Sequence, residues 1–358
     1  MSAKTVLVVG GCGFVGYHIV NAFIQDSAWS SIHVMSRNPS RNQVEGAHYH
    51  SGSLTSFEQV RSLLADIQPS LIIHTASPIG SGSASDSDFY DINVKGTKNL
   101  LKAAIASDHV RSFIYTSSVE VMEGSSHIFL TEDGQMYTIT SRAEYYAKTK
   151  AIADQAVLDA NGMGGLRTLC IRLAVVYGER DSQLIPGTLH ALQEGRHRYQ
   201  IGDNQSLFDY VSATNVAQSH LLAAKALLRQ PEDGSGKVDG EAFFITDGNP
   251  VPFWTFLRQI WSAAGDRTAP EEVTVVPAWF MLSLASAVEW LFWAFTLGLK
   301  RPKVLRRQIM TYACRPRTYS IEKARERLGY KPLDDRDEQI RTGVDWASRM
   351  HKEEKEAA

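Results

Sequence analysis

The sequence predicts an α/β protein in which helices cover both faces of a doubly wound parallel sheet and a smaller C-terminal lobe follows. Three observations lead to this fold. A short apolar run at residues 5–9 passes through a glycine-rich stretch into a helical pattern. Strand-like and helix-like segments then alternate as far as residue 172, which is typical of parallel strands joined by right-handed crossovers. From about Val175 onward the alternation is less regular, which indicates a second lobe.

The composition excludes several classes of protein. A chain of 358 residues that is 44% hydrophobic can bury a large core, and its net charge of −2 gives no basic region for nucleic acid. The three cysteines, Cys12, Cys170 and Cys314, lie far apart, so we expect a reducing compartment, no disulfides and no metal site. The apolar run at 5–9 is too short for a signal peptide, so we expect a cytoplasmic protein.

The first strand and helix flank a glycine pattern. Residues 5–9 (TVLVV) read as a buried strand, and Gly10, Gly13 and Gly16 follow it. Phe14 and Val15 then open a segment with helical periodicity. Glycines in this setting let the backbone approach a pyrophosphate whose charge faces the helix N-terminus. The pattern predicts a dinucleotide site; the alternative is a tight turn that binds no ligand.

The second strand, residues 31–36, should end at the cofactor ribose. A site specific for NAD usually has an acidic residue here, whereas this chain has Ser36 and Arg37, with Arg41 nearby. Without a carboxylate there is no repulsion toward a 2′-phosphate, and a guanidinium can bind that phosphate. The sequence therefore favours NADP over NAD. The alternative is that Arg37 is a solvated loop residue.

The remaining elements follow in order. We expect strands at 47–50, 71–75, 112–116 and 166–172, helices at 57–67, 88–106 and 142–160, and a late strand at 243–246. Ligands of such sheets lie beyond the carboxyl ends of the strands. That rule selects Thr75-Ala76-Ser77, Thr116-Ser117-Ser118 and the stretch from Leu173 to Tyr177. We predict a nucleotide-binding domain at 1–174, completed by parts of 205–247, and a substrate lobe at 175–358.

Two tyrosine–lysine pairs have the four-residue spacing that puts both side chains on one helix face. Tyr146 and Lys150 open the helix after the fifth strand and can face Ser117 and Ser118. A phenol beside an ammonium is a proton-transfer pair, because the positive charge favours the phenolate. Tyr319 and Lys323 lie far beyond the sixth strand, so we interpret them as a surface helix start without a role.

The stretch 277–299 is long and apolar, with Glu289 as its one charge. Our first interpretation is a buried helix that caps a greasy substrate pocket. The second is monotopic insertion into a membrane face, with the basic residues that follow against anionic headgroups. The third is a true membrane span, which needs about 20 apolar residues.

The glycine loop, the strand-end residues and the Tyr146–Lys150 pair resemble those of the extended short-chain dehydrogenase/reductases, and within them those of the 3β-hydroxysteroid dehydrogenase family. The resemblance runs from residue 5 to about 347. The matching segments are 10–16, 93–101, 113–121, 146–150, 202–204, 209–211, 215–216, 244–248 and 328–332. HTASP at 74–78 and EAFFITDGNPVPFW at 241–254 look most like the fungal sterol-4α-carboxylate 3-dehydrogenase (decarboxylating) branch. At two places this chain departs from that branch, which commonly has Asp where this chain has Ser36 and a Gly-Asp pair where this chain has Gly52-Ser53. Because of these departures, a diverged paralogue that acts on a related terpenoid fits the sequence as well.

The resemblance implies a Rossmann-type fold and hydride transfer at a secondary alcohol. Tyr146 would be the acid/base, Lys150 would lower its pKa and bind the nicotinamide ribose, and Ser118 would hold the substrate oxygen, with Ser117 as the runner-up. Asn93 would support the proton relay or merely bond backbone. The implied cofactor-binding residues are Gly10, Gly13, Phe14, Val15, Gly16, Ser36, Arg37, Ser53, Leu54, Thr75, Ala76, Ser77, Asn93, Thr116, Tyr146, Lys150, Leu173 and Val176. The implied substrate-binding residues are Ser118, Val119, Tyr146 and Tyr177.

The expected activity is NAD(P)-dependent oxidoreduction of the 3β-hydroxyl or 3-ketone of a steroid or polycyclic terpenoid. Loss of a C4 carboxylate as carbon dioxide can accompany it, and sterol or secondary-metabolite biosynthesis is the expected setting. We expect a location peripheral to the endoplasmic reticulum membrane on its cytoplasmic side, and a homodimer stays open. The alternatives are a nucleotide-sugar epimerase or dehydratase of the same fold and a non-catalytic NADPH sensor.

Overall fold

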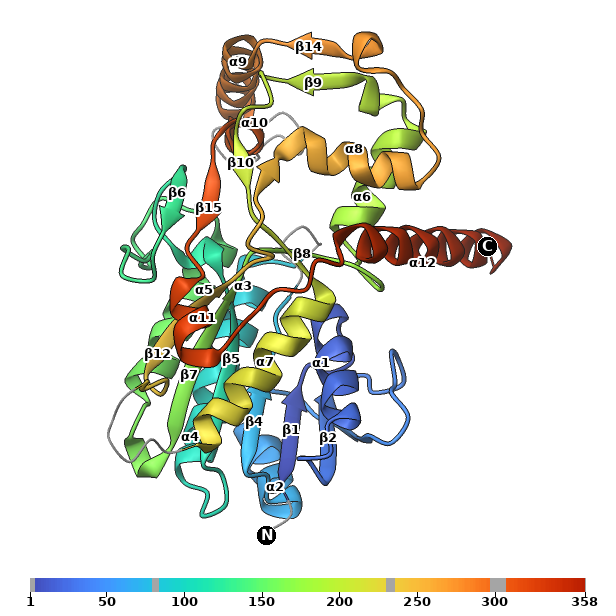
Figure 1. Cartoon of the computed structure of the whole chain (residues 1–358). Helices are drawn as coiled ribbons and strands as arrows, with labels where there is room; N and C mark the ends of the chain where they lie inside the picture. Colours follow the sequence, from blue (N-terminus) through green and yellow to red (C-terminus); the bar gives the residue numbers. More distant parts are fainter. Residues whose placement is uncertain (1–3, 79–83, 230–235, 297–306, 358) are drawn as a thin grey trace.

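The computed structural model describes residues 4–78, 84–229, 236–296 and 307–357. Within them lies a seven-stranded sheet in the order β12-β7-β5-β4-β1-β2-β3, with every neighbouring pair parallel (Figure 1). This confirms the predicted doubly wound α/β fold. The strands are β1 (Thr5–Val9), β2 (Ser31–Ser36), β3 (His48–Ser51), β4 (Leu71–His74), β5 (Ser112–Ser118), β7 (Arg167–Leu173) and β12 (Glu241–Ile245).

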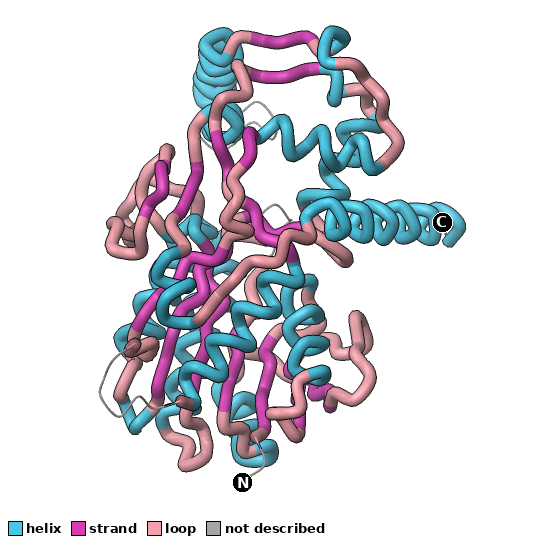
Figure 2. The backbone as a smooth tube through the Cα atoms, in the orientation of Figure 1, coloured by secondary structure: helices cyan, strands magenta, loops and turns pink. Residues whose placement is uncertain are grey.

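Helices cover both faces of this sheet (Figure 2). Alternate residues of β1 separate the two layers, since Val6 and Val8 pack with one set of helices and Leu7 and Val9 with the other. The first layer holds α1 (Phe14–Gln25), α7 (Ala213–Leu228) and α11 (Glu322–Leu328). The second layer holds α2 (Phe57–Ile67), α4 (Thr97–Ile105) and α5 (Tyr145–Asp159).

The helix expected at 88–106 is not a uniform α-helix. It consists of α3 (Asp86–Phe89), the π-helical η1 (Tyr90–Gly96) and α4. A π-helical turn widens the backbone by one residue and occurs often at functional sites. Here it turns Asn93 inward against α5. The helix expected at 142–160 begins three residues later, at Tyr145.

The upper lobe in Figure 1 is built from short pieces that return to the sheet edge. Three small sheets occur in its described part, with the orders β13-β10-β15-β6, β11-β8 and β14-β9. The strands are β6 (His127–Leu130), β8 (Val175–Tyr177), β9 (Tyr199–Ile201), β10 (Leu207–Phe208), β11 (Tyr210–Ser212), β13 (Val251–Pro252), β14 (Thr274–Val276) and β15 (Arg317–Tyr319). The helices are α6 (Leu184–Gln193), α8 (Phe253–Ala263), α9 (Ala278–Thr296), α10 (Arg307–Cys314) and α12 (Arg336–Ala357), and short helical turns are η2 (Val119–Val121), η3 (Met163–Gly165), η4 (Arg196–Arg198) and η5 (Pro270–Glu272).

The apolar helix α9 is exposed, so the interpretation of a buried cap is wrong. Of its side chains, only Ala285 is buried, whereas Trp279 is 71% exposed and Phe295 85%. The helix stands at the far end of the upper lobe, where its main contact among the described elements is with α10 (Figure 1). Its single charge is turned toward α10, because the Glu289 carboxylate accepts the backbone N–H of Arg307 at 2.9 Å. Residues 297–299 of the predicted stretch lie outside the described residues.

The interpretation of Tyr319 as a surface residue is also wrong. Tyr319 ends β15, is buried, and shares a hydrogen bond with the His127 ring at 2.9 Å. It packs against Phe244 of β12. Lys323 stands on α11 and pairs with Glu241, so the two side chains do not form a pair. Residues 317–319 form a strand, so the two-residue repeat of a strand determines which way Tyr319 points.

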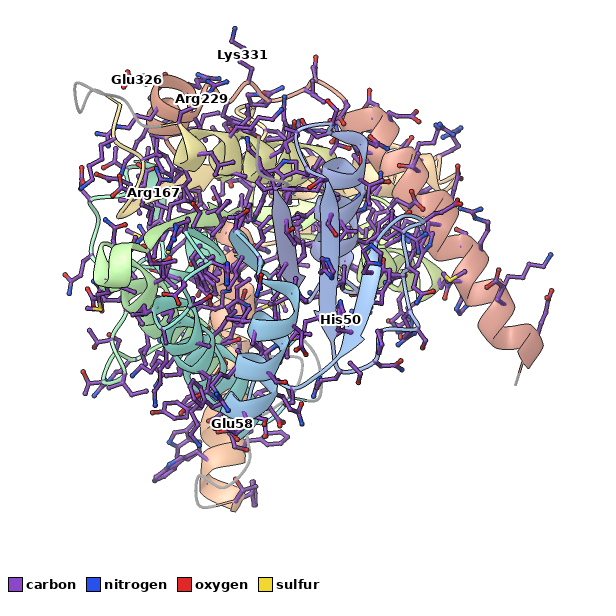
Figure 3. The ribbon with its side chains drawn as sticks, turned by 90° about the horizontal axis from the view of Figure 1, so that it is seen from below. His50, Glu58, Arg167, Arg229, Glu326 and Lys331 are labelled. Carbon is purple, nitrogen blue, oxygen red and sulfur yellow. The ribbon has the colours of Figure 1, made fainter. Side chains whose placement is uncertain are left out.

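The end of the sheet from which the strands start is a solvated surface. Figure 3 views the molecule from this side, and its labels include Arg167 at the start of β7 and Arg229 directly after α7 (Ala213–Leu228). The carboxyl ends of the strands lie at the opposite end, beneath the upper lobe (Figure 1). Ligand-binding residues of a parallel sheet are expected at that end.

Candidate active site

The glycine loop after β1 forms a cradle that only glycine can form. Gly10 has a φ of +88°, and a Cβ there would lie 2.7 Å from the backbone nitrogen of Ala76. A Cβ on Gly16 would lie 2.2 Å from the carbonyl oxygen of Gly10. The loop therefore packs tightly and leads directly into α1, whose N-terminal N–H groups face the crevice. This arrangement fits a dinucleotide pyrophosphate.

A crevice of about 3220 Å³ runs from the glycine loop to the upper lobe. A single small-molecule site occupies about 300–1,000 Å³, so this volume accommodates a dinucleotide and a second large ligand together. It brings together all but two of the predicted site residues. Those that line it are Gly10, Gly13, Phe14, Val15, Gly16, Ser36, Arg37, Ser53, Leu54, Thr75, Ala76, Ser77, Thr116, Ser118, Val119, Tyr146, Lys150, Leu173 and Val176.

Two predicted residues do not reach the crevice. Tyr177 is fully buried, and its hydroxyl donates to the carboxylate of Asp247 at 2.8 Å, so the prediction that it binds substrate is wrong. Asn93 is buried behind α5 and donates to the Thr149 hydroxyl at 3.1 Å, so it does not contact the cofactor. Its Oδ1 has no hydrogen-bond partner in the described part of the chain. Asn93 can act on the site only through α5.

The structure separates the two adjacent serines, which the sequence left open. Neighbouring strand residues point to opposite faces. Ser117 also borders the crevice, but its hydroxyl donates to the carboxylate of Asp154, which also binds the buried Arg172. Ser118 lines the crevice and is hydrogen-bonded to the Tyr146 hydroxyl. Ser118 is therefore the serine that can reach a substrate oxygen.

Tyr146 lies on the first turn of α5, at the floor of the crevice. Desolvation raises the pKa of its hydroxyl to about 12, while the hydrogen bond from Ser118 acts in the opposite direction. The nearby Glu120 carboxylate raises the pKa further. A phenol that is hydrogen-bonded at the bottom of a crevice is suited to donate or accept a substrate proton.

Lys150 is buried one turn after Tyr146. Its Nζ donates to the carbonyl oxygen of Thr116 at 2.6 Å and lies 4.2 Å from the centre of the Tyr115 ring. Burial lowers the pKa of Lys150 to about 7, and the nearby Asp154 carboxylate opposes this shift. The expectation that Lys150 lowers the pKa of Tyr146 stays a prediction.

The sequence did not reveal a polar cluster on the substrate side. Arg317 of β15 donates to the Glu120 carboxylate at 3.0 Å, and its guanidinium lies 4.3 Å from the centre of the Tyr312 ring. The Nε of Arg317 is shielded from solvent and has no hydrogen-bond partner in the described residues. Because Glu120 and Arg317 are 197 residues apart, only the folded chain brings them together.

Apolar side chains lie around this cluster. They come from α5, α6, α8 and α10, namely Tyr145, Leu184, Phe253, Leu257, Met310 and Tyr312, together with Val119. Among the described residues, no group of three or more His, Cys, Asp or Glu side chains could hold a metal ion. Ser118 and Tyr146 thus form a pair that can bind a substrate hydroxyl. The pair lies between the glycine loop on one side and the apolar residues of the upper lobe on the other.

The fold and this site together define a nicotinamide-dependent oxidoreductase of the extended short-chain type, which acts on CH–OH groups. The chain belongs to the 3-beta hydroxysteroid dehydrogenase/isomerase family, which it matches over residues 7–275.

Curated relatives carry the same pattern over nearly their whole length. The decarboxylating sterol-4-alpha-carboxylate 3-dehydrogenase of Gibberella zeae is 36% identical over 297 residues, which cover 82% of this chain and 96% of the relative. The enzyme of that name from Candida albicans is 32% identical and covers 96% of this chain and 98% of its own.

Solved structures share the fold at low identity. The UDP-glucose 4-epimerase of Thermotoga maritima superposes with a TM-score of 0.71 at 20% identity, over 97% of this chain and all of its own. The Bordetella bronchiseptica enzyme WbmH, solved with NAD+, gives 0.71 at 18% identity, over 97% of this chain and 99% of its own.

Proposed function

We propose that this protein oxidises the 3β-hydroxyl, or reduces the 3-ketone, of a steroid or related polycyclic terpenoid that carries a carboxylate on the adjoining carbon. The observation that carries the proposal is the group of apolar residues beside Ser118 and Tyr146, together with Arg317, whose side chain is 13% exposed. A sterol skeleton suits the apolar side chains, and a carboxylate suits Arg317. The names of the Gibberella and Candida relatives support the same substrate class.

In oxidation, the phenolate form of Tyr146 takes the hydroxyl proton as the carbon–hydrogen bond breaks. Bound NAD(P) supplies the hydride acceptor. Ser118 donates a hydrogen bond to the substrate oxygen and holds it against Tyr146. A charged Lys150 would favour the phenolate across the floor of the site, as the family resemblance implies. Reduction reverses these steps, with Tyr146 as the proton donor.

A carboxylate next to the new ketone makes the product a β-keto acid. Its carbon–carbon bond breaks with loss of carbon dioxide, and the bonding electrons move to the ketone oxygen as an enolate. Ser118 and the protonated Tyr146 stabilise that oxyanion by hydrogen bonds. Arg317 would hold the carboxylate before the bond breaks, with its Nε as the unused donor.

Paired substrates test the assignment of Arg317. A double variant, Glu120→Gln with Arg317→Met, removes both charges and so leaves no unpaired buried carboxylate. We expect kcat/KM for a 4α-carboxy-3β-hydroxysterol to fall about 10- to 100-fold, since a charge-assisted hydrogen bond contributes about 1.5–3 kcal/mol. The carboxyl-free 3β-hydroxysterol should lose little. Arg315→Met is the matched control, since Arg315 is exposed two residues away. Equal losses on both sterols would contradict the assignment.

We also propose a preference for NADP. Ser36 stands at the end of β2 and Arg37 is exposed beside it, at the rim of the crevice. No carboxylate lies at either position to accept hydrogen bonds from a ribose 2′-hydroxyl, and a guanidinium there can bind a 2′-phosphate.

We further propose that α9 contacts a membrane surface, on the cytoplasmic side of the endoplasmic reticulum. Among the described residues, α9 is the one helix long and apolar enough to cross a bilayer. Its exposed tryptophans, its single charge bound at the start of α10, and the basic residues that follow it in the sequence suit a helix lying in the headgroup layer. A lipophilic substrate would enter from that side.

A further inference from the structure

The segment that joins β8 to α6 crosses over the start of α1. The carbonyl oxygen of Glu179 accepts a hydrogen bond from His18 Nε2 of α1 at 2.8 Å. The next residue, Arg180, has a φ of +66°, in the left-handed region that non-glycine residues rarely adopt. Such a conformation is unfavourable for a residue with a Cβ and persists only where contacts hold it. The contacts of the Arg180 side chain are therefore informative.

The Arg180 guanidinium contacts both α1 and the loop after β2, two elements that border the nucleotide crevice. It lies 3.9 Å from the centre of the Tyr17 ring on the first turn of α1. Its Nη1 donates to the side-chain oxygen of Asn42, in the loop after β2, at 2.8 Å. Asn42 in turn donates to the carbonyl oxygen of Cys12, in the glycine loop, at 3.0 Å. A continuous chain of contacts thus runs from the second lobe to the glycine loop.

The guanidinium also has unused binding capacity. Its Nε is shielded from solvent and makes no hydrogen bond to the described residues. Its nearest carboxylate, on Glu179, is 3.7 Å from that Nε and partly exposed, so this ion pair is loose. The glycine loop, residues 10–16, contains no lysine or arginine. Apart from the partial charge of the α1 N-terminus, no cation in the loop itself balances a pyrophosphate.

We propose that Arg180 binds the cofactor pyrophosphate and closes the second lobe over the bound dinucleotide. Its stacking on Tyr17 of α1 brings it beside the glycine loop, to which Asn42 connects it through Cys12, whereas Arg37 stands directly at the end of β2. The inference rests on the proposed function only in requiring that NAD or NADP binds. The two arginines should differ in their effect on affinity. Arg180 should contribute equally to the binding of NAD and NADP, whereas Arg37 should contribute only to the binding of NADP, through its 2′-phosphate.

Titration of the full-length protein with each dinucleotide, in the absence of sterol, tests this assignment. Tryptophan fluorescence or calorimetry would give the Kd of NAD and of NADP for the wild type, Arg180→Ala, Arg180→Lys and Arg341→Ala. We expect Arg180→Ala to raise both Kd values by the same factor, about 10- to 100-fold, as for a lost charge-assisted hydrogen bond. Arg180→Lys should recover part of the affinity. Arg341, which pairs with Glu338 on the outside of α12, should have no effect.

Each outcome decides the assignment. Thermal unfolding without cofactor identifies a folding defect in Arg180→Ala, and the lysine variant then supplies the comparison. Unchanged Kd values in a folded variant would overturn the proposal, as would a loss confined to NADP, which would move Arg180 to the 2′-phosphate. Sterol turnover does not enter, so a protein that binds dinucleotides but oxidises no sterol overturns the proposed function and leaves this inference standing. A wild type that binds neither dinucleotide would overturn both.

Discussion

At the scale of single residues, the chemistry depends on which side chains the strand end exposes. Ser118 faces the crevice and Ser117 faces the buried Asp154–Arg172 pair, although the two serines are adjacent in the sequence. The fold likewise distinguishes Tyr146 from Tyr319 as the candidate proton acceptor, since Tyr319 is buried in a strand and hydrogen-bonded to His127. Residue type and spacing alone could not make either distinction.

Arg37 is the residue on which the NADP preference depends. Arg37→Ala should raise the Kd of NADP by about tenfold or more and leave the Kd of NAD within about twofold, because only NADP carries the 2′-phosphate that the guanidinium binds. Fluorescence titration with both dinucleotides measures this directly. Arg61→Ala is a suitable control, since Arg61 pairs with Glu58 on the exposed face of α2. Equal losses for the two cofactors would remove the argument for a 2′-phosphate site.

At the scale of elements, a buried carboxyl links β15 to the segment between β10 and β11. Asp209 is buried and accepts the backbone N–H of Tyr319 at 2.8 Å. Burial raises the pKa of this carboxyl from 3.8 to about 7. The folded chain therefore favours the protonated form. This contribution to stability is complete below pH 3.8 and is lost as the pH rises through about 7.

Asp209→Asn keeps this position neutral at every pH. The variant should be more stable than the wild type at about pH 8, by on the order of 1–4 kcal/mol, since one pKa unit corresponds to about 1.4 kcal/mol. The difference should shrink toward zero at about pH 4. Urea unfolding at several pH values measures it. A difference that does not change with pH would show that the Asp209 carboxyl has an ordinary pKa.

The exposed helix α9 gives a second prediction at this scale. Vesicles of phosphatidylcholine with anionic lipid should carry the wild type upward in a flotation gradient. Replacing Trp290 and Trp293, which are 65% and 63% exposed, with serine should lower the partition coefficient by about tenfold, because each aromatic side chain can bury about 150–250 Å². Met163→Ser is the control, since Met163 is exposed on the opposite end of the molecule.

Equal flotation of the wild type and the tryptophan variant would contradict the membrane contact. Sedimentation velocity of both proteins should accompany the flotation. A wild-type dimer that the two serines dissociate would show that a second copy of the chain, rather than lipid, covers α9.

At the scale of the whole molecule, the sequence predicted the sheet well and the upper lobe poorly. Strands such as 5–9 and helices such as 57–67 have a periodicity that is set locally by burial on one or both faces. In the upper lobe, Arg317 of β15 pairs with Phe208 and binds Glu120, so its environment is made by residues about 100–200 positions away. Local patterns carry no information about such contacts.

The candidate site divides along the same line. The nucleotide half could be predicted because its residues follow strand ends and a glycine loop. The substrate half could not be predicted, because the Tyr177 hydroxyl binds Asp247 instead of facing the crevice and because α9 is exposed instead of buried. The sequence patterns also did not identify Arg317 or Arg180 as site residues. The apolarity of α9 did not reveal that the folded chain leaves this helix exposed.

If this molecule oxidises a 3β-hydroxyl beside a carboxylate with Tyr146 as the proton acceptor, it must form reduced cofactor and carbon dioxide together. The most direct measurement follows reduced cofactor and labelled carbon dioxide from a 4α-carboxy-3β-hydroxysterol labelled in the carboxyl group. We predict equal amounts of both products with the wild type and with Tyr319→Phe, and a loss of about 10²–10⁴-fold with Tyr146→Phe at unchanged cofactor affinity. A wild type that forms neither product while it converts UDP-glucose would contradict the proposed function, and a Tyr146→Phe variant with undiminished turnover would contradict the role of Tyr146.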